Sequence, residues 1–298
     1  MTDLRDMELL RALDQHRHFA RAASACGISQ PAFSARIRNL ETDLGIAIVH
    51  RGNRFQGFTD EGLIVLQWAR RLLDDADALS QALSEARGHL TGELIIGSIP
   101  TALPFAADIP AMIRRRHPNL RVQLRSASAQ EIRQGIDSRA LHAGITYADD
   151  HITSGITRRP LYDEHYILLA PEDAAAWPED NLAWADAAKL PLCLLTEDMQ
   201  NRRIVNETFR SIGVQPVPVT STNAFTVALA QLAAGGAATI APALLVEKTN
   251  LPPTIRQYRL IDPIVTTSIE MIRLQRDPVP AAIKALEEVL DGSHDNQS

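Results

Sequence analysis

Apolar residues recur at helical spacing in three stretches of the first 44 positions. The stretches are Leu9, Leu10 and Leu13, then Phe19, Ala22, Ala23 and Cys26, then Phe33, Ile37, Leu40 and Leu44. Gly27 and Gly45 follow the second and third stretches, where glycine commonly ends a helix. Ser29 can cap the third helix, and Pro31 falls in its first turn, where a missing N–H costs nothing. The pattern predicts three short helices between residues 5 and 44.

Residues 46–58 carry two short apolar stretches on either side of the segment Arg51-Gly52-Asn53-Arg54. Turn-forming residues between two apolar runs are typical of a hairpin. We therefore expect two short strands joined by a basic tip.

From Thr59 the pattern changes to one long helix that ends between Gly88 and Gly92. Its apolar positions alternate by four and three residues for more than three heptads: Val65, Ala69, Leu72, Ala76, Leu79, Leu83, Ala86 and Leu90. Such a seam is typical of a helix that packs along another helix. It either packs against its own domain or forms a dimer interface. We predict dimerisation through Leu72, Leu79 and Leu83.

After Gly92 the chain alternates short apolar runs with stretches of helical period. The expected strands are 93–99, 120–124, 143–147, 192–195, 217–221 and 239–241, and the expected helices are 101–116, 129–138, 202–212 and 224–234. Alternation of this kind predicts parallel sheets covered by helices. The region is long enough for two small α/β units.

The charge balance argues against a protein that coats nucleic acid along its whole surface. The 298 residues carry a formal net charge of −6, with 45% hydrophobic and 22% charged residues, which indicates a folded chain of more than one domain. The stretch from Arg17 to Arg54 differs, because it holds six arginines and only two acids, Glu41 and Asp43. This local positive excess is compatible with a small DNA-binding module.

No segment indicates export, membrane insertion or metal binding. The polar start of the chain lacks the apolar core of a secretory signal, and the weakly polar run 232–246 is short and broken by two glycines and a proline. Cys26 and Cys193 lie far apart, and the nine histidines show no HxxxH spacing. We predict a cytoplasmic protein without a metal, a cofactor or a membrane partner.

Three segments of the N-terminal region resemble the helix-turn-helix of LysR-type transcriptional regulators. They are Phe19-Ala20-Arg21-Ala22-Ala23, then Ile28-Ser29-Gln30-Pro31-Ala32-Phe33-Ser34, then Ile37-Arg38-Asn39-Leu40-Glu41 with Leu44-Gly45. Residues 49–62 continue the match as a wing, and the long helix and the α/β region follow in the order that the family uses. The resemblance implies an all-α winged helix-turn-helix over 1–62, a linker helix over 63–91 and an effector-binding domain over 92–298.

Helix geometry and the resemblance together indicate which side chains contact DNA. With Phe33, Ile37 and Leu40 on the buried face of the third helix, its N-terminal end and opposite face can enter the major groove. Gln30 and Ser34 would reach base edges, and the arginines would contact phosphate or the minor groove. The predicted contact residues are Arg21, Ser29, Gln30, Pro31, Ser34, Arg36, Arg38, Arg51 and Arg54.

Three positions depart from the family's pattern. His18 stands where Ser or Thr often caps the second helix, and Phe58 replaces a leucine of the wing. Ala35 stands where a basic or long polar residue is frequent, so it can offer only a methyl contact to thymine. Base preference at that step is therefore left open.

For residues 92–298 the resemblance implies two α/β subdomains of the periplasmic-binding-protein type with an effector cleft between them. Subdomain I would cover about 92–160 and 265–291, and subdomain II about 161–264, with crossovers near Pro160 and Pro263. Independently, four strand-to-helix junctions carry polar residues, and helix N-termini at strand ends bind anions. The predicted ligand contacts are Ser98, Thr101, Ser128, Asn201, Arg202, Thr222 and Asn223. With Arg202 as the cation among them, we expect a small carboxylate or inorganic oxyanion.

The family interpretation implies promoter DNA and RNA polymerase as partners, and a homodimer that assembles into a homotetramer. A solute-binding protein would fit the region after Gly92 but not the first 90 residues. An enzyme lacks support, because the sequence shows no nucleophile elbow, P-loop, GxGxxG motif after a strand or metal cluster. The peroxide-sensing branch of the family uses a pair of regulatory-domain cysteines, and this chain has only Cys193 there. We predict a ligand-controlled regulator.

Overall fold

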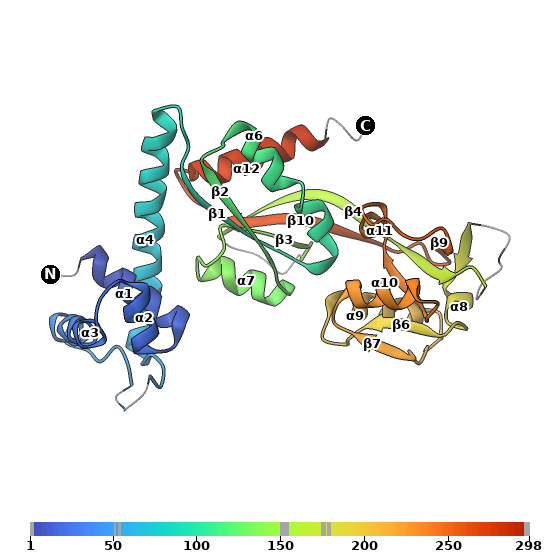
Figure 1. The fold of residues 1–298 in the computed structure, drawn as a ribbon, viewed down its shortest axis with the longest axis horizontal. Helices are drawn as coiled ribbons and strands as arrows, with labels where there is room; N and C mark the ends of the chain where they lie inside the picture. Colours follow the sequence, from blue (N-terminus) through green and yellow to red (C-terminus); the bar gives the residue numbers. More distant parts are fainter. Residues whose placement is uncertain are drawn as a thin grey trace. The chain divides into compact units, whose positions relative to one another are not determined.

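The computed structural model describes residues 3–50, 52, 55–149, 155–173, 177 and 180–294. The chain divides into two compact units, Met1–Gly92 and Glu93–Ser298. Figure 1 shows the elements of both units, with the N-terminal unit in blue to teal.

The N-terminal unit is built from helices. They are α1 (Leu4–His16), α2 (Phe19–Ala25), α3 (Gln30–Leu44) and α4 (Asp60–Ala86). The three short helices expected from the apolar stripes are confirmed, and the long helix begins directly after Thr59. Leu10, Phe33, Ile37 and Leu66 are among the buried side chains of a single core that draws on all these helices.

Side chains at the helix starts satisfy backbone N–H groups that have no partner within the helix. The hydroxyl of Ser29 accepts a hydrogen bond from the amide of Ala32 at 3.4 Å and so caps α3. His18 accepts one from the amide of Ala20 through Nδ1 at 3.2 Å. His18 therefore caps α2 although it departs from the family's pattern.

The connection between α3 and α4 is fastened to the end of α3. The carboxylate of Glu41 accepts hydrogen bonds from the amides of Ile48 and Val49 at 2.8 and 3.2 Å. Val49 and Phe58 form an isolated antiparallel pairing, which fits the expected hairpin. The two arginines of the expected basic tip lie outside the described residues.

Helix α4 buries one side and exposes an apolar stripe on another. Ala69 is fully buried in the core of its own unit, and Val65 packs against that core. The four-three seam is therefore not a partner interface along its whole length. Its first two residues, Val65 and Ala69, complete the core of the helix-turn-helix domain. The three leucines predicted for dimerisation are exposed: Leu72, Leu79 and Leu83.

The C-terminal unit alternates strands and helices. The strands are β1 (Gly92–Ser98), β2 (Leu120–Ser126), β3 (Ala143–Tyr147), β4 (Ile156–Pro171), β5 (Asn181–Ala183), β6 (Leu192–Leu195), β7 (Thr220–Thr222), β8 (Ala238–Pro242), β9 (Ile255–Ile261) and β10 (Thr266–Leu274). The helices are η1 (Pro100–Ala102), α5 (Leu103–Ala106), α6 (Ile109–Arg116), α7 (Ala129–Asp137), α8 (Trp184–Ala187), α9 (Gln200–Ser211), α10 (Phe225–Ala233), α11 (Ala243–Glu247) and α12 (Ala281–His294). Each of the six predicted strands overlaps an observed one.

The single helix expected over 101–116 is wrong. Three helical segments, η1, α5 and α6, occupy this stretch, and each has a proline at its first or second position. The prolines are Pro100, Pro104 and Pro110. Because proline lacks an N–H and clashes with the preceding turn, it starts a helix readily and interrupts one that is already running.

The strands form a mixed sheet in the order β2-β1-β3-β10-β4-β8-β6-β7, and β9 pairs with β4 and β5. β1 is parallel to β3, and β6 is parallel to β7 and β8. The expectation of parallel sheets needs correction, because β4 is antiparallel to β8, β9 and β10.

Strand β4 joins two lobes of this unit. It pairs with β10 as far as His165 and with β8 and β9 from Tyr166 onward. We call β1–β3 and β10 with α5–α7 and α12 the first lobe, and β5–β9 with α8–α11 the second lobe. In Figure 1, α6 and α12 lie side by side on the sheet of the first lobe, in agreement with their direct packing. The change of partners along β4 comes a few residues after the crossover expected near Pro160.

Candidate DNA-binding surface and ligand cavity

The N-terminal end of α3 is the most open part of the helix-turn-helix. Phe33 and Ile37 hold the helix in the core, while Gln30 and Pro31 are exposed and Ser34 is half-buried. Ser29 is also exposed, and its hydroxyl is engaged with the first turn as the cap. This arrangement leaves the Gln30 side chain available at the tip of a fixed helix.

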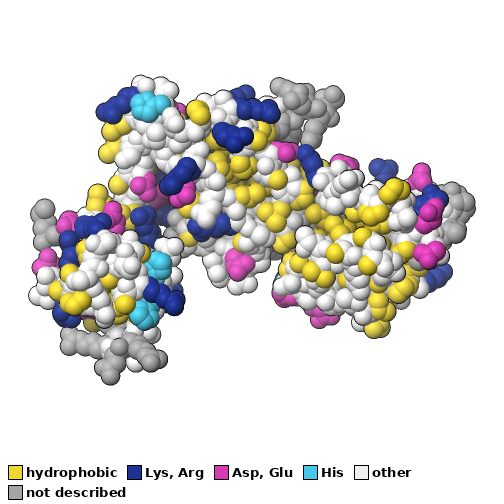
Figure 2. All heavy atoms as spheres, viewed as in Figure 1, with side chains coloured by type: hydrophobic (Ala, Val, Ile, Leu, Met, Phe, Trp, Pro, Cys, Tyr) yellow, Lys and Arg dark blue, Asp and Glu magenta, His cyan; other side chains and the backbone are white. Residues whose placement is uncertain are grey.

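Two of the arginines predicted to contact phosphate have side chains that are accessible to solvent. The side chains of Arg21 on α2 and Arg38 on α3 are exposed, and neither has an ion-pair or hydrogen-bond partner within the described part of the chain. In the space-filling view, basic side chains and histidines are interspersed with acids on the visible face of this unit (Figure 2). Arg51 and Arg54, predicted at the wing tip, lie outside the described residues.

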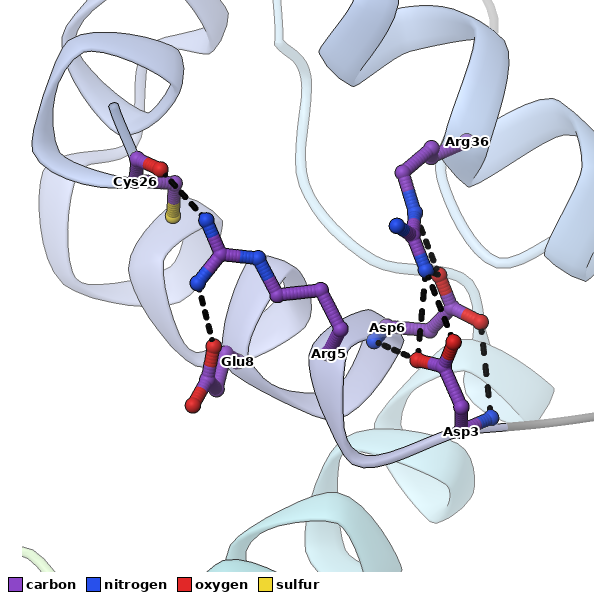
Figure 3. A network of polar contacts seen from close by, with 6 residues as sticks. All are labelled: Asp3, Arg5, Asp6, Glu8, Cys26 and Arg36. Carbon is purple, nitrogen blue, oxygen red and sulfur yellow. Dashed lines mark hydrogen bonds and ion pairs between the residues drawn. The ribbon is translucent and has the colours of Figure 1, made fainter. Parts of the chain in front are cut away.

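Arg36 has a different role from the one predicted. Its guanidinium lies 2.7 Å from Asp6 and 3.1 Å from Asp3, so it ties α3 to the start of α1 (Figure 3). The hydrogen bond with Asp6 and the nearby carboxylates raise the pKa of Arg36 above its usual value. Because two carboxylates already satisfy the guanidinium, we remove Arg36 from the set of phosphate contacts.

Figure 3 shows a second tie in the same region. Arg5 on α1 donates to Glu8 at 2.7 Å and to the backbone carbonyl of Cys26, the residue that follows α2, also at 2.7 Å. Together with Arg36, this arginine fastens α1 to both helices of the helix-turn-helix. The contacts fix the position of α3 without occupying its exposed face.

The C-terminal unit contains a cavity of about 120 Å³ between its lobes. It is lined by Ile99, Pro100, Thr101, Ser128, Ala129, Gln130, Tyr147, Asp198, Met199, Gln200, Asn201 and Arg203. These residues follow β1 and β6, end β3 or begin α7 and α9. The cavity therefore lies at the carboxyl ends of parallel strands, where ligands bind in open α/β sheets.

Three of the seven predicted ligand contacts line this cavity: Thr101, Ser128 and Asn201. Ser98 does not, because its side chain is buried and its hydroxyl donates to the carbonyl of Ile99. Thr222 and Asn223 do not line it either, and the Thr222 hydroxyl accepts from the amide of Ala224 ahead of α10.

Arg202 was predicted as the cation of the site, and this prediction is wrong. Its guanidinium donates to the carbonyl of Leu195 and to the side chain of Asn206, both at 2.7 Å, within the second lobe. The helix begins at Gln200, two residues earlier than expected, so Arg202 is turned toward the protein and Arg203 lines the cavity. Burial lowers the pKa of Arg202 from its usual value.

The two helix N-termini at the cavity differ in what they offer a ligand. Ser128 and Glu131 form a capping box at α7, which satisfies the amides of these two residues. Helix α9 has no side-chain cap at Met199. Asn201, in its first turn, is 4% exposed, and its Nδ2 has no acceptor within the described residues. The α9 side of the cavity therefore presents donors that lack a partner.

Sequence reasoning missed Tyr147, Asp198 and Arg203 as lining residues. Tyr147 is the last residue of the strand predicted over 143–147, so its place at the carboxyl end of that strand was a usable indication. Its hydroxyl lies 3.2 Å from that of Thr101. Asp198 and Arg203 bring one charge of each sign to the lining.

Comparison with known proteins agrees with this architecture. The family described as "LysR substrate binding domain" matches residues 87–293. The family described as "Bacterial regulatory helix-turn-helix protein, lysR family" matches residues 4–63. The chain belongs to the LysR family. The resemblance seen in α2 and α3 is thereby confirmed.

Curated relatives align with this chain over only part of their length. The hydrogen peroxide-inducible genes activator of Pectobacterium carotovorum subsp. carotovorum is 34% identical over 196 residues, which is 65% of this chain and 65% of the relative. The SDS degradation transcriptional activation protein of a Pseudomonas species is 44% identical over 127 residues, or 42% of this chain and 41% of the relative. The chain thus spans less than two thirds of the length of these relatives.

Solved structures share the fold along nearly the whole chain. A full-length OxyR mutant from Pseudomonas aeruginosa has a TM-score of 0.78 at 22% identity and covers 97% of this chain and 95% of that chain. CbnR in complex with its target DNA has a TM-score of 0.69 at 23% identity and covers 98% and 100%. The predicted fold class, a winged helix-turn-helix followed by a linker helix and a periplasmic-binding-protein-like region, is confirmed.

No cysteine is among the residues that line the cavity, and the described residues form no metal site. Cys193 is fully buried in β6, where burial raises the pKa of its thiol. Within the described ranges, no three His, Cys, Asp or Glu side chains are placed to hold a metal ion. No helix in the described part of the chain is long and apolar enough to span a membrane.

Proposed function

We propose that this protein is a transcriptional regulator that binds promoter DNA through α3 and responds to a small molecule bound in the cavity of its C-terminal unit. The observation that carries the proposal is the capped, exposed N-terminal end of α3 in a LysR-family helix-turn-helix, with Gln30 and Arg38 free of protein partners. The named relatives are activators of gene expression, which agrees with this assignment.

The base-reading role falls to Gln30 and Ser34 because they lie at the end of the helix that enters the groove first. A glutamine amide can pair with the two hydrogen-bonding positions of adenine, whereas arginine near the backbone mainly contributes charge. Arg21 and Arg38 are accordingly assigned to phosphate. Arg51 and Arg54 of the wing join them as proposed contacts from the sequence alone.

Binding to the protein's own promoter region should separate the two roles. Gln30→Ala should cost about 1–3 kcal/mol on the specific site and relax base preference at one step. Arg38→Ala should weaken binding to specific and unrelated DNA alike. It should also reduce the slope of log affinity against log salt concentration by about one, which corresponds to the loss of one phosphate contact. Fluorescence anisotropy at several salt concentrations measures both quantities.

Arg87→Ala is the matched control for the loss of one arginine, because Arg87 is exposed at the far end of α4 from the helix-turn-helix. It should leave affinity and salt dependence unchanged. Wild-type affinity and base preference in both the Gln30 and the Arg38 variants would remove α3 from the proposed interface.

For the ligand we propose a small molecule with an oxygen acceptor group, such as a carboxylate or an inorganic oxyanion. The support is the uncapped start of α9 and the unpartnered Nδ2 of Asn201, both of which need an acceptor. Asp198 faces the same space as the uncapped start of α9, so a single acceptor group accounts for the site better than a highly charged anion.

Peroxide is a competing inducer because several relatives are named for it. Its chemistry at a cysteine needs an accessible thiolate. Cys193 is the one cysteine of residues 93–298, and it is fully buried with a raised thiol pKa. Reversible ligand binding therefore suits this chain better than thiol oxidation.

The ligand assignment is tested by a thermal-shift screen of small organic acids on the full-length protein. Thr101→Val and Asn201→Ala should abolish the shift given by any compound that stabilises the wild type, since the first removes the hydroxyl that contacts Tyr147 in the cavity wall and the second removes an unpartnered donor. Thr222→Val, at a junction that does not line the cavity, is the control and should respond like the wild type. An acid that stabilises all three variants equally binds elsewhere.

Assembly through α4 belongs to the same proposal. A dimer would place two α3 helices on two half-sites, and a pair of dimers would form the tetramer. RNA polymerase is the expected partner at the promoter. The exposed stripe of Leu72, Leu79 and Leu83 supports the dimer.

A further inference from the structure

A buried carboxyl group lies behind the wall of the cavity. Glu164 is 2% exposed and stands on β4 close to the point where this strand changes partners from the first lobe to the second. It lies opposite Thr267 of β10. Neither the DNA-binding surface nor the cavity lining uses this residue, and an acid in such a place needs a physical reason.

The surroundings of Glu164 consist of hydroxyl groups. Tyr166 on β4 donates to Glu164 Oε1 at 3.2 Å, and its hydroxyl also lies 3.4 Å from that of Thr267 on β10. Thr101 of η1, which lines the cavity, also acts on this carboxyl group and lowers its pKa. The second carboxyl oxygen and the hydroxyl of Tyr162 are both buried without a hydrogen-bond partner among the described residues.

No cation compensates this carboxyl in the described part of the chain. The groups that act on it are the hydroxyls of Tyr166 and Thr101, and burial outweighs them, so the pKa of Glu164 rises to about 7. Tyr147 of β3 and Tyr162 of β4 also face it, and burial raises the pKa of both phenols, which therefore keep their protons.

The charged neighbours of Glu164 along the strand belong to other contacts. Asp163 and His165 are exposed and interact with Ser268 and Thr266 on β10. The side chains of β4 alternate between two faces, so these residues point away from the Glu164 side. Arg202 of α9 is held by Leu195 and Asn206.

A line of hydroxyls connects Glu164 with the cavity. Thr101 acts on the carboxyl group of Glu164 and lowers its pKa, and the Thr101 hydroxyl lies 3.2 Å from that of Tyr147. Thr101 and Tyr147 both line the cavity, and Asn201 faces Tyr147 there. Each hydroxyl has one proton, so the state of the carboxyl decides the direction in which the line donates.

The two protonation states of Glu164 present different hydrogen-bonding groups to a ligand in the cavity. When Glu164 is ionised, its unpartnered carboxyl oxygen can accept a hydrogen bond from the Thr101 hydroxyl, and Thr101 then accepts a hydrogen bond from Tyr147, so the Tyr147 proton is not offered to the cavity. When Glu164 is protonated, it donates to Thr101, Thr101 donates to Tyr147, and the phenol proton is free for an acceptor in the cavity. Hydroxyl protons stay on their own oxygens, and the only net change is one proton taken from solvent by the carboxyl.

We propose that Glu164 is a proton switch for the cavity, and that a ligand with an oxygen acceptor, such as a carboxylate, binds together with the uptake of one proton at this residue. The inference rests on the proposed ligand site and adds its regulation. Binding and protonation then favour each other by the same factor, as linkage requires. The affinity for a carboxylate should be constant below pH 7 and fall about tenfold for each pH unit above it.

Calorimetric titration of the full-length protein with acetate between pH 6 and pH 8.5 tests the switch, in two buffers of different ionisation enthalpy at each pH. The wild type should take up close to one proton per acetate at pH 8.5 and almost none at pH 6. Glu164→Gln should bind acetate with one affinity at every pH and without proton uptake, because a Gln amide can donate to Thr101 permanently. Tyr147→Phe should bind more weakly at pH 6 and lose most of the pH dependence.

Asp163→Asn provides the matched control, since it removes a carboxylate from the neighbouring position on the other face of β4 and should retain the wild-type profile. Acetate binding that is equal at pH 6 and pH 8.5 in the wild type, or an unchanged profile in Glu164→Gln, overturns the switch and leaves the ligand site standing. If Glu164→Gln does not fold by circular dichroism, wild-type proton uptake and Tyr147→Phe decide. A protein that binds its promoter but no acetate at any pH overturns the acceptor class and the switch with it, while the DNA-binding proposal survives.

Discussion

Replacing Leu79 with aspartate should convert the assembled protein into smaller species in sedimentation velocity experiments and lower its affinity for promoter DNA. Leu79 is 62% exposed in the single chain, although it occupies a position of the four-three seam of α4. A carboxylate placed in an apolar helix pair loses its hydration without gaining a partner, which costs several kcal/mol. DNA affinity falls as well, because two half-sites are no longer bound by one assembly.

The apolar stripe around Leu79 is longer than the sequence seam indicated. Ile64 and Trp68 are exposed to a similar degree as the three leucines. At 100° per residue, these five side chains fall within an arc of about 100°, beside the face that packs in the helix-turn-helix core. A stripe of this kind along a helix of 27 residues is the size of surface that a second helix covers.

Leu63 offers a control with the same substitution on the same helix. Its side chain is 53% exposed, but it lies on the side of α4 opposite the stripe. Leu63→Asp should therefore sediment like the wild type. If Leu79→Asp also keeps the wild-type sedimentation coefficient down to low protein concentration, α4 is not the dimer interface.

The N-terminal unit could be predicted almost entirely from its sequence. Phe33, Ile37 and Leu40 give α3 a regular buried stripe, and Ser29 supplies the cap that sets where the helix begins. Arg36 could not be assigned in this way. Its carboxylate partners lie at least 30 positions earlier in the chain, and local spacing carries no information about such a contact.

The C-terminal unit was less predictable where its strands carry charge. The part of β4 that pairs with β10 includes Arg158 and Glu164, so it lacks the apolar run or clean alternation by which a strand is found. Arg158 can stand there because it pairs with the buried Glu270 of β10 at 2.9 Å. The same two strands, β4 and β10, link the lobes, and therefore the sequence located the cavity by its strand ends but not the group behind its wall.

Glu164 should also make the stability of the C-terminal unit depend on pH, in a direction opposite to that of most carboxylates. Its pKa is raised from 4.5 to about 7 by folding, so the folded state binds the proton more tightly than the unfolded state. The contribution is fully present below pH 4.5 and is lost as pH rises toward 7, by about 1.4 kcal/mol per pH unit and up to about 3 kcal/mol in all.

Glu164→Gln removes this pH-dependent contribution to stability, because the amide does not titrate. We expect calorimetry from pH 5 to pH 8.5 to show a change in the unfolding temperature of the C-terminal unit. Relative to the wild type, this temperature should rise in the variant by roughly 6–12 °C as the pH increases. Asp163→Asn should show no such gain. A difference between Glu164→Gln and the wild type that is the same at pH 5 and pH 8 would mean that Glu164 is already ionised in the folded protein. The line of hydroxyls would then be fixed in one direction, with the proton of Tyr147 held by Thr101.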